Sequence, residues 1–209
     1  TDYLYKDGRK NTIAVQVTNK QPSSRWYSGS GIYRDVTLSY RDKVQVAENG
    51  NHITTPKLAQ QKDGNVETQI QSKIKNTAKT LAKVFVEQQI FTKEGKAVSD
   101  LVRSVTKNLA GNETADFKQT ILVNKPTLWT TKSYHPQLYV LKTKVYNDGQ
   151  LVDVTEDTFG YRYFNWTAKE GFSLNGERMK FHGVSIHHDN GALGAEENYK
   201  ATYRKLKLL

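Results

Sequence analysis

The chain has 209 residues, of which 36% are hydrophobic and 11% aromatic. This composition is too apolar and too aromatic for a disordered chain, and no run approaches the roughly 18 apolar residues of a membrane-spanning helix. Cysteine is absent, which excludes disulfides, thiolate metal sites and a cysteine nucleophile.

The net charge of +10 is spread along the chain instead of being concentrated in one segment. Most lysines fall at alternate positions of predicted strands, as expected for the solvated face of β-structure. Diffuse positive charge attracts polyanions without reading a sequence, so nucleic acid is not an expected partner. The abundance of Lys, Asn, Gln, Thr and Tyr favours a bacterial surface or secreted location, with the cytoplasm as the alternative.

The first part of the chain contains two alternating stretches, residues 13–17 and 36–40. Apolar side chains recur there at every second position, which indicates half-buried strands. The loop between them contains Pro22, Gly29 and Gly31. Two or three strands cannot bury a core alone, so we expect the last strands of a β-domain whose earlier strands are not in this chain.

A more complete all-β pattern begins at about Val44. The predicted strands are residues 44–46, 66–74, 81–90, 117–123 and 138–146. Turn signals separate them, namely Asp63-Gly64, Glu94-Gly95, Gly111-Asn112 and Asn147-Asp148-Gly149. About seven short strands in about 110 residues fit an immunoglobulin-like sandwich.

The pattern changes at Thr158. Residues 159–166 predict one strand, and residues 172–174 and 178–184 flank Asn175-Gly176. Asn-Gly is a strong hairpin signal because both residues tolerate positive φ.

Residues 196–209 predict a helix with an apolar face. That face carries Tyr199, Thr202, Leu206 and Leu209. A strand, a loop and one amphipathic helix make a single βα unit with nothing to pack on. We therefore expect a fragment that holds the tail of one domain, one whole domain and the start of another.

Four stretches carry a family resemblance. They are residues 25–38 (RWYSGSGIYRDVTL), 124–145 (NKPTLWTTKSYHPQLYVLKTKV), 157–164 (DTFGYRYF) and 172–194 (FSLNGERMKFHGVSIHHDNGALG). In this order they resemble glycoside hydrolase family 2, the β-galactosidase and β-glucuronidase family. The last stretch, with HHDNGALG, is more similar to the bacterial β-galactosidase branch.

The resemblance implies a mainly β fold, in which an immunoglobulin-like β-sandwich is flanked by parts of two other domains. Residues 1–43 would end a sugar-binding jelly roll, and residues 44–156 would form the sandwich. Residues 157–209 would contain the lead-in and the first strand and helix of a (β/α)8 (TIM) barrel. The pattern of predicted strands gives nearly the same boundaries.

The resemblance also implies one wall of an active site. The C-terminal ends of TIM-barrel strands form the active site, and residues 180–184 would be the first barrel strand. His187 matches the family histidine that hydrogen-bonds sugar hydroxyls in the −1 subsite; the alternative is a loop histidine with only structural bonds. His188 and Asp189 would help hold the loop or touch substrate, and Asn19 lies on a loop that approaches the active site in some members.

Other candidate residues favour structural roles. His182 is expected to be buried within the barrel strand. A zinc site made of His182, His187 and Asp189 is not expected, because a strand and a loop offer no fixed ligand geometry. No cofactor is predicted in this chain, and Mg or Na would belong to the parent enzyme. The cluster of aromatic and arginine side chains near the N-terminus is expected to pack the jelly roll; it comprises Arg25, Trp26, Tyr27, Tyr33 and Arg34.

The chemistry needs two carboxyl groups, which retaining glycosidases place about 5–5.5 Å apart. In the family both come from later barrel strands, so no catalytic role falls to Asp189, Glu196 or Glu197. We expect a fragment of a retaining β-galactosidase, inactive alone, whose parent takes β-galactosides. Two alternatives stay open: a β-glucuronidase of the same family, and a non-catalytic glycan- or protein-binding module. The oligomeric state is left open.

Overall fold

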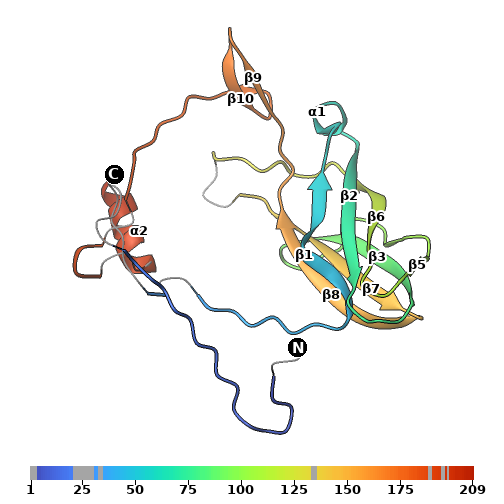
Figure 1. Ribbon diagram of the computed structural model, residues 1–209. Coiled ribbons are helices and arrows are strands. Elements are labelled where there is room, and N and C mark those ends of the chain that lie inside the picture. Colours follow the sequence, from blue (N-terminus) through green and yellow to red (C-terminus); the bar gives the residue numbers. More distant parts are fainter. Residues whose placement is uncertain are drawn as a thin grey trace. The chain divides into compact units, whose positions relative to one another are not determined.

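The structure is a computed structural model that describes residues 4–20, 31–32, 35–132, 136–187, 190–193, 196 and 198–209. The chain divides into two units, Ser39–His182 and Thr1–Leu38 with Gly183–Leu209. All of the described strands lie in the first unit (Figure 1). The predicted mainly β class is confirmed.

Two antiparallel sheets make up most of the first unit (Figure 1). One sheet has the order β1-β2-β6, and the short helix α1 follows β1. The other has the order β4-β3-β7-β8, with β5 also paired to β3. The bounds are β1 Val44–Thr54, α1 Leu58–Gln61, β2 Asn65–Asn76, β3 Ala82–Thr92, β4 Val102–Arg103, β5 Lys107–Leu109, β6 Thr114–Asn124, β7 Tyr139–Asn147 and β8 Gln150–Phe159.

The alternation of apolar side chains explains why these residues form facing sheets. Along β2 every second residue from Val66 to Asn76 is buried, while the residues between them are exposed or half-buried. Successive side chains of a strand point to opposite faces, so one face of β2 is directed into the sandwich. Ile74 of β2 shares a core cluster with Val86 of β3 and Val145 of β7, which places the two sheets face to face.

A layer of polar side chains lies between two apolar clusters of the core. Ser72, Gln88 and Thr143 are fully buried on β2, β3 and β7. On each strand the residues two positions to either side belong to different clusters, as Ile70 and Ile74 do on β2. The Gln88 amide nitrogen donates to the hydroxyls of Ser72 and Thr143, both at 2.9 Å. These bonds offset part of the cost of burying polar groups.

Asn51 extends this polar layer to the edge of the sandwich. It follows the register shift in β1 between Val46 and Asn51. Its Oδ1 accepts a hydrogen bond from the Ser72 hydroxyl at 2.6 Å, and its Nδ2 donates to Asp157 Oδ2 at 2.6 Å. One side chain thereby links the two sheets through β2 and β8.

A small third sheet follows the sandwich, with the order β11-β10-β9. Its strands are β9 Phe164–Thr167, β10 Gly171–Leu174 and β11 Glu177–Arg178. Asn175 and Gly176 have φ values of 53° and 84°, which confirms the predicted hairpin turn. Farther along the chain are a 3-10 turn, η1 Gly191–Leu193, and helix α2 Tyr199–Leu208.

Helix α2 begins later than the sequence predicts. Asn198 is its N-cap, and the Asn198 side chain accepts hydrogen bonds from the backbone N–H groups of Lys200 and Ala201. An asparagine at this position satisfies donors that have no partner within the helix. The cap therefore places the first helical residue at Tyr199 instead of Glu196.

Several predicted strands are absent from the described part of the chain. Residues 13–17, 36–40 and 180–184 contain no strand, so the start of the barrel is not confirmed. A strand requires a hydrogen-bonded neighbour, and no described segment pairs with these residues. The predicted strand 159–166 is instead the end of β8 followed by β9, and β8 itself was not predicted.

None of the helices in the described ranges has the length and apolar character required to cross a membrane.

Candidate functional site

The predicted sugar-binding histidine lies in an irregular segment. Residues 179–187 form neither helix nor strand, and the side chain of His187 is exposed. His182 is also exposed, which corrects the expectation of burial, because no paired strand covers it. Asn19 lies in residues 4–20, which contain no helix or strand, and is exposed.

Several predicted site residues lie outside the described residues. They are His188 and Asp189 of the loop and the aromatic and arginine cluster of Arg25, Trp26, Tyr27, Tyr33 and Arg34. Of the predicted site, the structure therefore locates only His187 and Asn19.

The best-defined feature that precedes this segment along the chain is the junction between the sandwich and the hairpin, centred on Asn175. The Asn175 Nδ2 donates to the Trp129 carbonyl oxygen at 2.8 Å, and its Oδ1 accepts from the Tyr163 backbone N–H at 3.2 Å. The Asn175 backbone N–H donates to the Tyr163 carbonyl oxygen at 2.8 Å. One turn residue thus holds three segments together, and an ion pair between Lys132 and Glu177 adds a further link.

Trp129 is fixed on the other side of this junction. Its backbone N–H donates to the Tyr161 carbonyl oxygen at 2.8 Å, and the Arg162 guanidinium lies 4.7 Å from the centroid of its ring. Gly160 packs so closely that a Cβ added there would lie 2.9 Å from the Trp129 Cβ. Trp129 is half-buried and serves as an anchor for the segment that leads out of the sandwich.

An apolar hollow opens beside the junction. Its lining comes from the Trp129 segment, the hairpin and the residues just after it, and includes Trp129, Phe164, Phe172 and Phe181. Phe164 and Phe181 are 68% and 63% exposed, and the Phe172 and Phe181 ring centroids are 4.6 Å apart. These rings form an aromatic surface that the described residues leave open to solvent.

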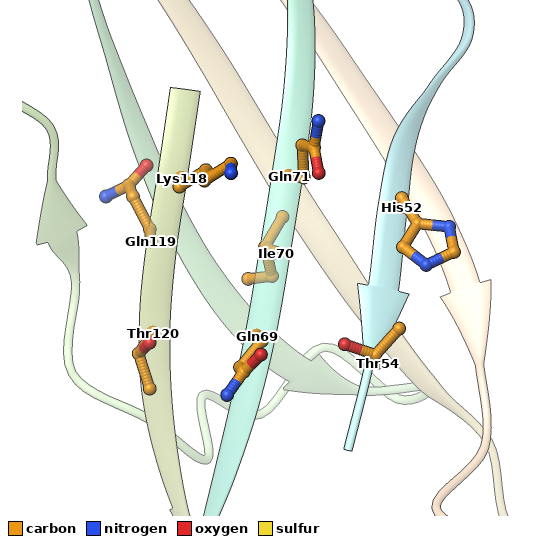
Figure 2. A pocket seen from close by; sticks show the side chains of 8 residues that line it. All are labelled: His52, Thr54, Gln69, Ile70, Gln71, Lys118, Gln119 and Thr120. Carbon is orange, nitrogen blue, oxygen red and sulfur yellow. The ribbon is translucent and has the colours of Figure 1, made fainter. Parts of the chain in front are cut away.

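A second hollow crosses the outer face of sheet β1-β2-β6. Figure 2 shows side chains from all three strands around it, including His52, Gln69, Gln71 and Lys118. These groups supply hydrogen-bond donors and acceptors, but the lining contains no Phe, Tyr or Trp ring on which a sugar could stack. We therefore assign no ligand to this polar face.

Two described carboxyl groups, those of Asp7 and Glu94, have a pKa below the ordinary value. An acid that works near neutral pH needs a raised pKa. The Arg9 side chain lowers the pKa of Asp7 by hydrogen bonding, and the Thr92 side chain does the same to the pKa of Glu94. Among the described residues, no cluster of three or more His, Asp or Glu side chains is arranged to hold a metal ion.

The two facing sheets define the chain as a β-sandwich module. A family model described as glycosyl hydrolases family 2 matches residues 50–162, which is more than half of the chain. The match covers the sandwich from β1 through β8 and reaches Arg162, beside the Trp129 anchor. The chain belongs to this family.

Two curated relatives are similar over nearly all of the chain. A β-galactosidase of Bacteroides ovatus, BoGH2A, is 37% identical over 210 aligned residues, covering 100% of this chain and 24% of the relative. A putative β-glucuronidase of Formosa agariphila is 35% identical over 186 residues, covering 88% of this chain and 16% of the relative. The chain thus spans a quarter or less of the length of these relatives.

A solved structure supports the same family and the same partial coverage. The family 2 glycosyl hydrolase from Bacteroides cellulosilyticus matches with a TM-score of 0.76 and 33% identity, over 88% of this chain and 23% of that one.

Sequence reasoning identified Asn175-Gly176 as a turn but not its side-chain bonds to other segments. Those bonds reach Trp129, 46 positions away in the sequence. Motif spacing carries no signal for such a contact. The Gly160 approach to Trp129 had a weak signal, because glycine after a strand end often marks close backbone packing.

Proposed function

We propose that this chain is part of a retaining β-galactosidase that hydrolyses terminal β-galactosides. Alignment of the whole chain with the β-galactosidase BoGH2A at 37% identity carries this proposal. In it, residues 1–43 end a jelly roll, residues 44–156 form the sandwich, and residues 157–209 lead into a catalytic barrel.

The reacting groups are proposed to lie outside this chain. A retaining glycosidase uses one carboxyl group as acid and base and a second as nucleophile, about 5–5.5 Å apart. The lowered pKa values of Asp7 and Glu94 are opposite to those of a general acid. The chain also spans 24% of the length of BoGH2A, which leaves most of such an enzyme to supply both groups.

Within this enzyme His187 is proposed to bind the sugar. Its exposed imidazole can donate from one ring nitrogen and accept at the other, which suits a pair of sugar hydroxyls. His188 and Asp189, the next two residues, are proposed to hold this loop or touch substrate, and Asn19 is a further candidate.

The sandwich is proposed to act as a rigid scaffold that supports the hairpin. The bonds from Asn175 to Trp129 and Tyr163 tie the hairpin to the end of the sandwich. A site held by a rigid scaffold keeps its geometry during reaction. These bonds would thus fix the position of the hairpin, and the His187 segment would continue from it.

A second candidate is a β-glucuronidase of the same family. The relative from Formosa agariphila is named a putative β-glucuronidase, and one from Bacteroides fragilis, 26% identical over 201 residues, is named a β-glucuronidase. A glucuronide differs from a galactoside by its carboxylate, which would require a cationic partner in the site.

The test is hydrolysis of a panel of nitrophenyl β-glycosides by this chain and by the longer gene product. Hydrolysis of the galactoside by the longer product alone would support the proposal. Preference for the glucuronide would favour the second candidate. Activity in the isolated chain would contradict the placement of the carboxyl groups, and inactivity of both would favour a binding module.

The role of His187 is tested in the longer product by His187→Ala. We expect kcat/KM for the preferred glycoside to fall about 10- to 100-fold, because a hydrogen bond to a sugar hydroxyl is lost. His52→Ala, on the outer face of the sandwich, is the control and should leave kcat/KM unchanged. Equal kcat/KM values for the two variants would contradict a role of His187 in binding the sugar.

A further inference from the structure

The hairpin that follows the sandwich has one apolar face and one polar face. Strands β9 and β10 pair so that Trp166 lies opposite Phe172, and Phe164 lies opposite Leu174. Successive side chains of a strand point to opposite faces, so these four side chains share one face. The other face carries the polar residues between them, namely Asn165, Thr167 and Ser173. This is the pattern of a sheet that packs one face against a core and leaves the other in water.

The apolar face is open to solvent in the part of the chain that the structure describes. Phe164 and Trp166 are 68% and 67% exposed. The Phe181 ring lies against this face, with its centroid 4.6 Å from that of Phe172 and 6.2 Å from that of Trp166, and is itself 63% exposed. We call the set of Phe164, Trp166, Phe172, Leu174 and Phe181 the aromatic face. A contiguous exposed apolar patch of this kind marks an interaction surface.

The chemistry of the aromatic face fits an apolar protein surface better than a glycan. A sugar site needs several polar groups that converge on the hydroxyls. Within the described lining of the adjoining hollow, only Thr131 and Arg162 carry a hydroxyl, amide or charged group, and Arg162 already lies over the Trp129 ring. Phe172 is inclined by 58° to Trp166 and by 42° to Phe181. Inclined rings of this kind are typical of aromatic side chains that pack within a core.

The surroundings of the aromatic face indicate that its cover belongs to the same polypeptide. The hollow that adjoins the face is also lined by Trp129, so the face is continuous with the junction that joins hairpin and sandwich. The chain aligns over its whole length with BoGH2A yet spans only 24% of it. Two surfaces on one polypeptide meet at a high effective concentration. A cover from the same enzyme therefore needs no separate partner.

We propose that the aromatic face is an internal interface of the longer enzyme, covered by apolar side chains of the polypeptide outside these 209 residues. The inference rests on the proposed function in one respect, because it takes the chain as part of a longer enzyme. Each aromatic side chain buries about 150–250 Å² when it is covered. The covered rings would hold the hairpin against the rest of the enzyme, while Asn165 on the polar face would stay in water.

The test compares hydroxyl-radical oxidation of side chains in the 209-residue chain and in the longer gene product, mapped by mass spectrometry. We expect Phe164, Trp166 and Phe181 to be oxidised at least about fivefold more slowly in the longer product, because a covered ring contacts little solvent. Phe117 and Tyr161 are buried in the sandwich and should react slowly in both proteins. They provide the reference for a fully covered ring.

Two variants of the longer product place the same charge on opposite faces of β9. Trp166→Asp should raise the oxidation rates of Phe164 and Phe181 to within about twofold of those in the 209-residue chain, because an unpaired charge is costly in an apolar interface. Asn165→Asp, one residue away on the polar face, should leave both rates unchanged. The comparison of the two wild-type proteins does not depend on the folding of either variant.

Three outcomes would overturn the inference. They are equal oxidation of the three rings in both wild-type proteins, equal effects of Trp166→Asp and Asn165→Asp, and protection that appears in the 209-residue chain as its concentration rises but not in the longer product. The last outcome would assign the face to a second copy of the chain. A longer product that hydrolyses the galactoside while its rings stay reactive would contradict this inference alone. Protected rings in a product that hydrolyses no glycoside would support it and contradict the proposed function.

Discussion

Gly160 shows at the scale of a single residue how a close contact constrains the sequence. An added Cβ would lie 2.9 Å from the Cβ of Trp129 and 3.2 Å from its Cγ and Cδ1. Trp129 has little room to move, because its backbone bonds to Tyr161 and Arg162 covers its ring. The absence of a side chain at residue 160 is therefore a packing requirement.

We expect Gly160→Ala to lower the free energy of unfolding by about 1–3 kcal/mol, as overpacking does in well-packed sites. Urea denaturation followed by fluorescence measures this change. Gly183→Ala is the control, because nothing lies within 4 Å of the added Cβ, and its effect should stay within about 0.5 kcal/mol. A Gly160→Ala protein as stable as the wild type would show that Trp129 can shift.

Tyr161 is a second residue whose environment has a measurable consequence. It is fully buried, and its hydroxyl lies 2.8 Å from the Thr68 hydroxyl. Burial raises the pKa of Tyr161 well above its ordinary value, and the Thr68 hydrogen bond opposes this shift only in part. The folded protein therefore holds this proton more tightly than the unfolded chain does.

The sign of the pH dependence follows from this raised pKa. The stabilisation is fully present below the unfolded pKa of about 10 and is lost as the pH rises above it, by up to about 1.4 kcal/mol per pH unit. Urea denaturation between neutral and strongly alkaline pH should show a shallower loss for Tyr161→Phe than for the wild type. Thr68→Val keeps the buried phenol and should retain the wild-type slope; a flat profile for Thr68→Val would contradict burial as the cause.

At the scale of elements, the strands that alternate in sequence and also find a partner are the ones that form. Residues 66–74 lie in β2, which pairs with both β1 and β6. Residues 13–17 alternate as well, yet pair with no described segment. Alternation reports which face of a strand can be buried, but hydrogen bonding to a neighbour makes the strand.

The hairpin turn allows a comparison between local and long-range effects. Asn175 and Asp148 both occupy the positive-φ position before a glycine, with φ values of 53° and 48°. Only Asn175 adds side-chain bonds to other segments, at Trp129 and Tyr163.

We expect Asn175→Ala to cost about 1–2 kcal/mol more than Asp148→Ala, because two hydrogen bonds are lost besides the shared backbone strain. Hydrogen exchange measured by mass spectrometry should become faster across β9 and β10 in Asn175→Ala. In Asp148→Ala the change should be confined to the turn between β7 and β8. Equal effects of the two substitutions would mean that the junction contributes nothing beyond turn geometry.

At the scale of the whole molecule, regular structure is concentrated in Ser39–His182. The described residues outside it contain only η1 and α2 as regular elements. Helix α2 has no buried residue, and Leu206 and Leu208 are 58% and 76% exposed. Backbone without a hydrogen-bonded ladder opens more readily than a buried strand.

Limited trypsin digestion tests this distribution of stability. We expect early cleavage after Lys20 and Lys180, which are exposed and lie in no helix or strand, and late cleavage after Lys118 within β6. Mass spectrometry should find a persistent fragment that contains β1 through β10. Early cleavage between β1 and β8 would instead show that the sandwich is not the stable unit.

The sequence by itself determined the class of the fold, the positions of β1, β2, β3, β6 and β7, the Asn175-Gly176 turn and the family. Each of these depends on local features: the two-residue period, residues that tolerate positive φ, and motifs in a fixed order. His187 was also identified from a motif, but its role in sugar binding stays a prediction.

Only the tertiary structure decided which alternating segments form strands and which distant residues come into contact. β8 forms because β7 offers it a ladder from Tyr139 to Asn147, whereas residues 180–184 have no described neighbour. The polar layer through Gln88 and the Asn175 bond to Trp129 join residues far apart in sequence. Such contacts depend on the packing of two sheets, and no periodicity within one segment encodes the partner on another.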